Sequence, residues 1–346
     1  MLYIPVVDSA GAPLMPCHPA RARELVRNGK AVRRFVKCLF YIQLTERVGG
    51  AKQDIAIGID PGSKREALTV KSEAHTFLNI QAEAVQHVSK AVEARRNMRR
   101  ARRFRKTPCR KNRNNRARGG LVPSTKARWQ WKLRIVAQLA KIYPITDIVV
   151  EDIKAVTKRG KRKWNCSFSP LEIGKKWFYE ELKRFGKVHT KQGYETFEMR
   201  NAAGLKKSSR KLSEVFEAHC VDSWVLANWL VGGHVIPDNK RMMCIAPIRL
   251  HRRQLHMLQP AKNGVRKRYG GTRSCGLKRG SLVYNSKCGL SYVGGTTTEK
   301  ISLHSVVTGR RVTQVANPAD CRFLTYNMWR ARLLPDPKAG VSVAKN

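Results

Sequence analysis

Residues 54–62 read Asp-Ile-Ala-Ile-Gly-Ile-Asp-Pro-Gly, and this stretch sets the expected fold of the chain. Its alternating apolar residues predict a buried strand that carries Asp60 at its tip, and Pro61-Gly62 predicts the turn that ends it. Two more strand-like runs follow at 66–71 and 74–83, so a hairpin meander is expected. By itself, an aspartate at a strand end more often only caps a turn, so a catalytic interpretation needs partners elsewhere in the chain.

The charge of the chain points to a polyanionic partner. Its 346 residues include 69 Lys plus Arg against 24 Asp plus Glu, a formal net charge of +45. Such a charge repels itself unless it is neutralised, and nucleic acid is the obvious counter-charge, bound tightly and with steep salt dependence. A basic membrane-surface protein is the alternative, but no long apolar span or amphipathic anchor supports it.

The nine cysteines do not predict a zinc ribbon, because none forms a Cys-x-x-Cys pair. Cys275 and Cys288 could be combined with His251 and His256, but the spacing is poor, and ordinary thiols are the favoured interpretation. We therefore expect no zinc. The odd, irregular cysteine count favours a reducing cytosol, and the N-terminus lacks the features of a signal peptide, so a cytoplasmic location is expected.

The first 48 residues predict a small basic α+β unit. It would contain a strand at 2–8, a loop at 9–16, a helix at 19–28 and a strand at 31–44. Within the loop, two prolines bracket Leu14-Met15, which predicts either a stiff, specifically shaped loop or a plain linker.

An internal segment is extremely basic. Residues 84–105 have helical character, and from Arg95 to Arg118 there are thirteen Arg or Lys and no acid. A disordered basic tail is the alternative interpretation, but the run lies between two apolar segments, which favours phosphate binding. The expected nucleic-acid-binding residues are Arg95, Arg96, Arg99, Arg100, Arg102, Arg103, Arg105, Lys106, Arg110 and Arg113.

The second half of the chain supplies further acidic positions. A helix at 126–143 and a strand at 145–150 lead into Glu151-Asp152, and helices are expected at 172–185 and 212–231. His219 and Asp222 share one face of the last helix, where they either cap a core or activate water with a metal. Residues 187–209 are polar and poorly patterned, and 237–335 predicts a basic antiparallel β domain.

Three carboxylates therefore occur along the chain in the order expected for a single active site: Asp60, Glu151 and Asp222. Carboxylate oxygens bind hard cations such as Mg²⁺ or Mn²⁺, and two such ions would clamp a reacting phosphate. His219 would act as the general base. The choice of Glu151 over Asp152 rests on motif register alone.

Three motifs resemble the split RuvC segments of the IscB-type, transposon-encoded RNA-guided nucleases: Ile-Gly-Ile-Asp60-Pro-Gly, Ile-Val-Val-Glu151-Asp-Ile and His219-Cys-Val-Asp222. Pro13-Leu14-Met15-Pro16 is similar to that family's N-terminal PLMP domain. The resemblance implies an α/β fold with an RNase H-like (RuvC) core, split by an arginine-rich bridge helix and flanked by a small α+β and a β-rich domain. The implied segments are 1–48 (PLMP), 49–90 (RuvC I), 91–122 (bridge helix), 123–209 (RuvC II and linker), 210–236 (RuvC III), 237–335 (β-rich) and 336–346 (disordered tail).

One departure refines this resemblance. Only 67 residues separate Glu151 from His219, and His189 is the only histidine among them, so the HNH nuclease of IscB is absent, as in IsrB. The resemblance then implies a nickase that cuts the non-target DNA strand, as a monomeric protein in a ribonucleoprotein. A large structured guide RNA would supply scaffold, and the β-rich domain would read a short motif beside the DNA target.

Two alternatives remain open at this stage. An OrfB-like nuclease would make double-strand breaks with one RuvC site, but its paired Cys-x-x-Cys motifs are missing. A non-catalytic protein that binds transposon-derived RNA would have no need of clustered carboxylates.

Overall fold

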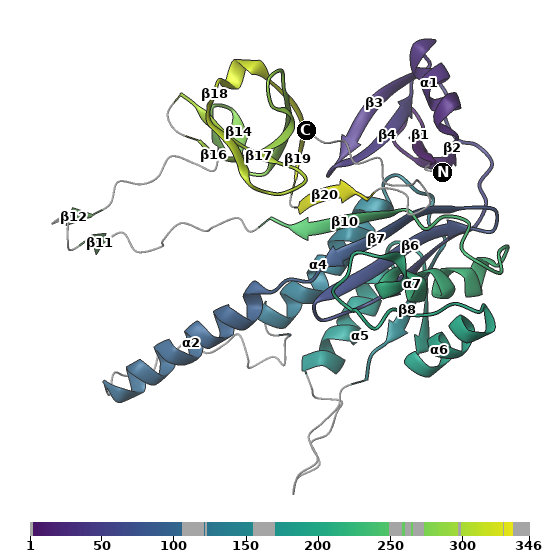
Figure 1. The fold of residues 1–346 in the computed structure, drawn as a ribbon, viewed down its shortest axis with the longest axis horizontal. Coiled ribbons are helices and arrows are strands. Elements are labelled where there is room, and N and C mark those ends of the chain that lie inside the picture. The colour runs from purple at the N-terminus through teal and green to yellow at the C-terminus, as the bar shows by residue number, and fades with distance from the viewer. Residues whose placement is uncertain are drawn as a thin grey trace, which may run out of the picture.

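A computed structural model gives the fold, and it describes residues 3–105, 121, 123–154, 170–248, 258–259, 264–265, 273–296, 299–327 and 329–334. Figure 1 shows a small N-terminal unit, a central sheet with helices, and a second β unit near the C-terminal end. The architecture is mixed α/β, as the sequence predicted. The expected tail at 336–346 lies outside the described residues.

The central sheet has seven strands in the order β20-β10-β7-β6-β5-β8-β9. The predicted meander forms its middle: β5 pairs antiparallel with β6, and β6 with β7. β8 lies parallel to β5, and β9 parallel to β8. The bounds are β5 Ile55–Asp60, β6 Arg65–Ser72, β7 Thr76–Glu83, β8 Asp147–Asp152, β9 Lys187–Gln192, β10 Met242–Pro247 and β20 Trp329–Leu333.

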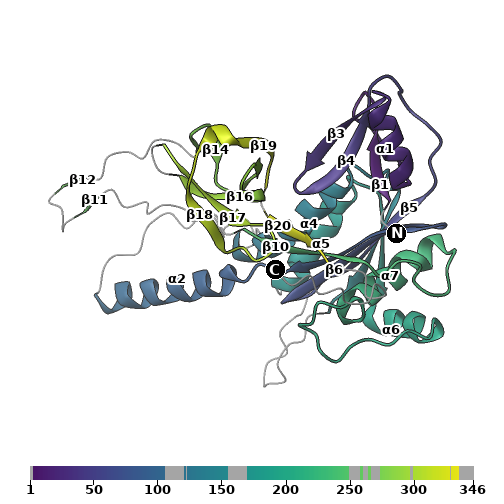
Figure 2. The same ribbon diagram turned by 45° about the horizontal axis from the view of Figure 1, so that its top comes forward.

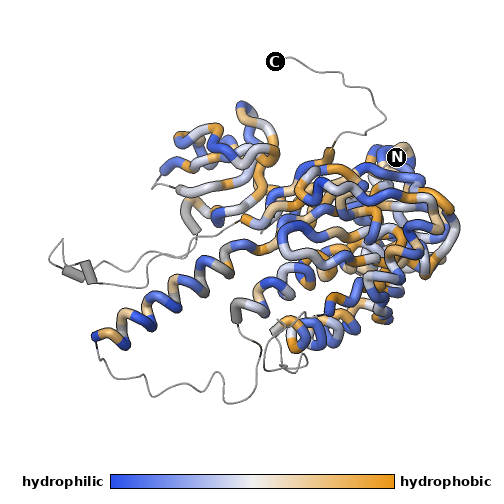
Figure 3. Tube along the Cα trace, turned by 60° about the horizontal axis from the view of Figure 1, so that its bottom comes forward, coloured by the Kyte–Doolittle hydropathy of each residue, from blue (hydrophilic) through white to orange (hydrophobic). Residues whose placement is uncertain are grey.

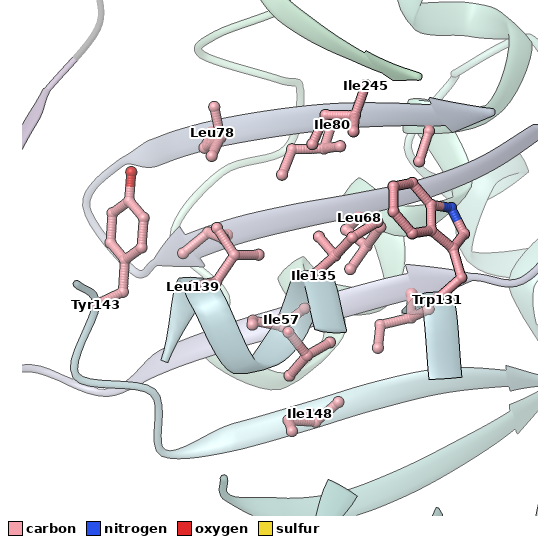
Figure 4. Packing of buried hydrophobic residues seen from close by; sticks show 14 of the residues in the cluster. Ile57, Leu68, Leu78, Ile80, Trp131, Ile135, Leu139, Tyr143, Ile148 and Ile245 are labelled. Atoms are coloured by element: carbon pink, nitrogen blue, oxygen red, sulfur yellow. The ribbon is translucent and has the colours of Figure 1, made fainter. Parts of the chain in front are cut away.

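Helices cover both faces of this sheet, which explains why all six residues of β5 are buried. On one face, α4 (Pro123–Leu139) places Trp131, Ile135 and Leu139 over the strands, as Figure 4 shows. α5 (Pro170–Leu182) packs beside α4. On the other face lie α6 (Gly193–Ala202) and α7 (Phe216–Val231), which Figure 2 shows next to each other.

The strand β9 and the helix α6 lie in the range 187–209, where the sequence showed no clear pattern. β9 is short and only partly buried at the edge of the sheet, so it lacks strict apolar alternation. A capping box of Gln192 and Glu195 starts α6. The missing pattern thus reflects an edge strand and a surface helix.

The basic segment begins with α2 (His87–Phe104), a long helix that extends away from the central sheet in Figures 1 and 3. The tube of α2 in Figure 3 alternates hydrophilic with weakly hydrophobic residues, as its sequence does. The rest of the expected bridge segment, 106–120 and 122, lies outside the described residues.

In the N-terminal unit, two sequence expectations were wrong. Pro13–Cys17, expected as a loop, forms the strand β2, which pairs with β1 (Ile4–Val7). β2 lies at the edge of its sheet, where a proline is tolerated although it has no backbone N–H to donate. The single strand expected at 31–44 is a hairpin of β3 (Ala31–Val36) and β4 (Leu39–Leu44), turned by Lys37 and Cys38 at positive φ. The helix α1 (Pro19–Arg27) has Pro19 in its first turn, as expected.

The C-terminal β unit is a five-stranded antiparallel sheet in the order β18-β17-β16-β15-β19. Its strands are β15 Ser281–Asn285, β16 Gly289–Thr296, β17 Ile301–Ser305, β18 Arg311–Ala316 and β19 Cys321–Tyr326, with the 3-10 turn Pro318–Asp320 before β19. Two short ribbons precede it: β11 Leu258–Gln259 with β12 Gly264–Val265, and β13 Arg273–Ser274 with β14 Leu277–Lys278. The range 237–335 is not wholly one antiparallel unit, because its outer strands β10 and β20 complete the central sheet.

Candidate active site

The structure brings Asp60 and His219 together from distant parts of the chain. Asp60 is the last residue of β5, with 8% of its surface exposed, and His219 lies in the first turns of α7. The distance from His219 Nδ1 to Asp60 Oδ2 is 3.4 Å. The strand end and the helix face that the sequence predicted therefore meet at one point.

A glycine in β5 makes this approach possible. A Cβ built on Gly58 would lie 1.8 Å from the carbonyl oxygen of Ser223 in α7 and 2.8 Å from the backbone nitrogen of Ala227. No other residue has a side chain small enough for such a contact. Gly58 therefore sets how closely the helix carrying His219 and Asp222 lies on the strand carrying Asp60.

The second nitrogen of His219 is also held. His219 Nε2 lies 2.8 Å from the carbonyl oxygen of Lys211, which can only accept a hydrogen bond, so Nε2 carries the proton. In neutral imidazole this leaves the Nδ1 lone pair directed toward Asp60. The contact thus fixes the tautomer in which Nδ1 can accept a proton.

Asp222 is nearly inaccessible, at 1% exposure, and is paired with two cations. Its Oδ1 lies 2.5 Å from Nη1 of Arg200, which extends from α6. Its Oδ2 is bonded by the ammonium group of Lys207, in the segment between α6 and α7. The sequence analysis missed both partners, although a signal exists: Arg200, Lys206, Lys207, Arg210 and Lys211 occur between Glu198 and Glu214 with no acid.

Glu151 belongs to the same electrostatic group. Its pKa is raised to about 7, first by burial and then by the negative charges of Asp60 and Asp222, against the opposing effect of Lys207 and Arg200. For Lys207, burial acts to lower the pKa, but the charges of the carboxylates raise it overall. Lys207 therefore acts as a shared counter-ion of all three carboxylates.

Asp152 lies on the opposite face of β8, because side chains alternate along a strand. Its carboxylate accepts hydrogen bonds from Tyr179 at 2.8 Å and Gln192 at 2.9 Å, and it pairs with Lys175 at 2.7 Å. Hydrogen bonding to these partners, despite burial, lowers its pKa. The contacts of Asp152 are structural, which leaves Glu151 as the residue of this pair that is coupled to Asp60 and Asp222.

The donor types fit a divalent cation, since carboxylate oxygens are the ligands that Mg²⁺ and Mn²⁺ prefer. The arrangement is not yet a metal cage: within the described part of the chain, no group of three or more His, Cys, Asp or Glu side chains could hold a metal ion. Both oxygens of Asp222 are already bonded by Arg200 and Lys207. Asp60, Glu151 and Asp222 therefore fit such an ion in their chemistry, provided that Lys207 moves away from Asp222.

The expected nucleic-acid-binding residues fall partly within the described chain. Arg96, Arg99, Arg100, Arg103 and Arg105 are exposed at α2 and its C-terminal cap. Arg95 and Arg102 belong to the same helix, but their side chains are outside the described residues, as are Lys106, Arg110 and Arg113 altogether. The described arginines form an exposed basic surface suited to phosphate, with no acid from residue 94 to 105.

The weak zinc hypothesis combined two cysteines and two histidines of the C-terminal range. Cys275 and Cys288 pack, partly buried, against the core of the C-terminal sheet. His251 and His256 lie outside the described residues.

Comparisons with known proteins find similarities for part of the chain. Residues 4–163, somewhat less than half of it, match the family model described as RRXRR protein. Among solved structures, the chain is similar to T. thermophilus RuvC in complex with Holliday junction substrate, at 12% identity and a TM-score of 0.28, covering 52% of this chain and 98% of that one. A similarity of that size carries no inference about activity. No curated protein matches significantly. No described helix is long and apolar enough to cross a membrane.

Proposed function

We propose that this chain is a RuvC-like, metal-dependent endonuclease whose site is built from Asp60, Glu151, Asp222 and His219. The strand order β7-β6-β5-β8-β9, with an antiparallel meander followed by parallel strands, supports an RNase H-like core. The observation that carries the proposal is the contact between Asp60 and His219, beside two more carboxylates that share the counter-ion Lys207. A protein that only bound phosphate would gain nothing from three acids at one site, of which Asp60 and Asp222 are buried and Glu151 is half-buried.

The residues of the chain divide the chemistry between them. Lewis acidity toward a phosphate oxygen is what Mg²⁺ or Mn²⁺ would supply when held by the carboxylates. His219 Nδ1 would take the proton of the attacking water, since Nε2 is committed to the Lys211 carbonyl. The Lys211 carbonyl orients the imidazole from the other side, and the Asp60 carboxylate, 3.4 Å from Nδ1, would stabilise the imidazolium that forms.

We further propose that cutting is RNA-guided and confined to one strand, the non-target strand of a guide-matched duplex. The IscB-type motifs, the net charge of +45 and the exposed arginines of α2 support an RNA partner. Between β8 and α7, the described residues form α5, β9 and α6, which pack with the central sheet or its helices. This segment supports a single nuclease site, and hence a nickase.

The substitution Asp60→Ala tests the assignment. The chain would be purified with its co-expressed RNA and assayed with Mn²⁺ on a duplex that matches the guide. We expect Asp60→Ala to abolish cutting and to leave RNA binding nearly unchanged, since Asp60 is far from α2 in sequence and carries no positive charge. Loss of RNA binding together with cutting would contradict the metal-site assignment.

A non-catalytic RNA-binding protein is the second candidate, and one observation favours it. Asp222 is bonded through both oxygens to Arg200 and Lys207, as in a purely structural charge cluster. This function predicts that Mn²⁺ binds no more tightly to the unmodified chain than to the Asp60→Ala variant. A clear difference in Mn²⁺ affinity would favour the nuclease.

A further inference from the structure

The helix α6 exposes two aromatic rings to solvent. Tyr194 is 64% exposed and Phe197 is 53% exposed, and their spacing of three residues puts both on one face of the helix. The opposite face buries Thr196 and packs Met199 against the core beneath α7. The two rings are therefore not needed for the packing of α6.

This aromatic face is directly connected to the candidate active site. The guanidinium of Arg200 lies 5.3 Å from the ring centroid of Phe197, while its Nη1 lies 2.5 Å from Asp222 Oδ1. A single side chain thus separates the exposed ring from a proposed metal ligand. A base stacked on the open face of Phe197 would be separated from Asp222 by the ring and by the guanidinium of Arg200.

The segment that follows α6 is positively charged and exposed. It carries Lys206, Lys207, Arg210 and Lys211, and no acid occurs before Glu214. The helix itself carries the exposed Glu198. Phosphates are therefore favoured over the segment 206–211, and uncharged rings over the helix.

We propose that Tyr194 and Phe197 form a stacking seat for bases of a single nucleic-acid strand next to the site of cutting, with its phosphates on the segment 206–211. This inference rests on the proposed function and names the form of substrate that the site accepts. Aromatic rings stack on every base, so such a seat tolerates any sequence. A guided nuclease needs that tolerance, because pairing with the guide reads the sequence.

Photo-crosslinking tests the seat without any cutting. The full chain would be irradiated in EDTA with a single-stranded oligothymidylate in which 5-iododeoxyuridine replaces one thymidine, and the adducts mapped by mass spectrometry. We expect adducts on Tyr194 or Phe197 in addition to those on basic regions. Adducts confined to α2 and the C-terminal sheet would overturn the proposal.

Affinity for the same oligonucleotide provides the second readout, in salt high enough to weaken binding by phosphates alone. Phe197→Leu keeps an apolar side chain but removes the ring face, and should weaken binding about tenfold, whereas Phe197→Trp should preserve it. The matched control is Tyr284→Leu, because Tyr284 is 48% exposed and has Arg322 at 5.9 Å from its ring centroid. An equal loss in both leucine variants would overturn a specific seat.

The outcomes separate this inference from the proposed function. Cutting by the unmodified chain with no adduct on α6 would contradict the stacking proposal alone. Adducts on α6 without cutting in any divalent metal would contradict the nuclease proposal alone. If Phe197→Leu instead dissociates a dimer in sedimentation, the rings form a protein interface and the seat is wrong.

Discussion

Lys207 should compete with the metal for Asp222, and its removal should tighten metal binding. The ammonium group bonds a carboxylate whose side chain is 2% exposed, while the lysine side chain is 31% exposed. A hydrogen bond between such charged groups contributes about 1 to 2 kcal/mol after allowance for screening by water. Lys207→Ala should therefore raise Mn²⁺ affinity about 5- to 30-fold.

The matched control is Lys206→Ala, which removes the same charge from the exposed neighbouring residue. Electron paramagnetic resonance of free Mn²⁺ would give both affinities in the full chain. Without metal, Lys207→Ala should also melt at a lower temperature than Lys206→Ala, because the carboxylates lose their shared counter-ion, and saturating Mn²⁺ should remove that difference. Equal Mn²⁺ affinities in the two variants would refute competition at Asp222.

Three further predictions concern the fold around the site and the basic helix. Lys132→Met removes the ion-pair partner of the buried Glu66, and burial already raises the pKa of this carboxyl group. The substitution should therefore lower the free energy of unfolding by about 3–5 kcal/mol at pH 8. Less should be lost as the pH falls toward the ordinary carboxyl pKa, because burial raises the pKa of Glu66 in the folded state and so favours its neutral form. A pH-independent loss in urea unfolding would contradict this. Gly58→Ala should displace α7 and abolish cutting, because the added methyl group would overlap the backbone of α7. The control is Gly295→Ala, whose added methyl group meets nothing within 4 Å and which should still cut. Cutting by both variants at the unmodified rate would show that Gly58 is not needed for the close approach of α7 to β5. A fourfold substitution in α2 replaces Arg99, Arg100, Arg102 and Arg103 with alanine. It should weaken RNA binding and reduce the slope of log affinity against log salt concentration by about 3. An unchanged slope in a salt titration would exclude phosphate binding by these arginines.

The sequence predicted the centre of the fold because its signals are local. The alternation in 54–62 and its Pro-Gly stop define β5 and place Asp60, and the long apolar helix defines α7. The contact between Asp60 and His219 then follows from two strong elements that pack against each other.

The parts that the sequence did not predict depend on long-range contacts. Arg200 and Lys207 reach Asp222 from α6 and the segment after it. The acid-free basic run around them indicates positive charge, but it does not indicate that Asp222 is the partner. Likewise, β10 and β20 join the central sheet through pairing with β7 and with each other, and a short strand carries no signal of its partner. The Pro13–Cys17 strand was missed because prolines are usually a loop signal.

Strand-resolved cleavage tests the central claim most directly. The chain would be purified with its co-expressed RNA and given Mg²⁺ and a guide-matched duplex whose two strands carry different labels. A single RuvC-like site at Asp60 predicts a cut in the non-target strand alone, and no cut in the Asp60→Ala variant. Cuts in both strands, or a cut that survives Asp60→Ala, would contradict it.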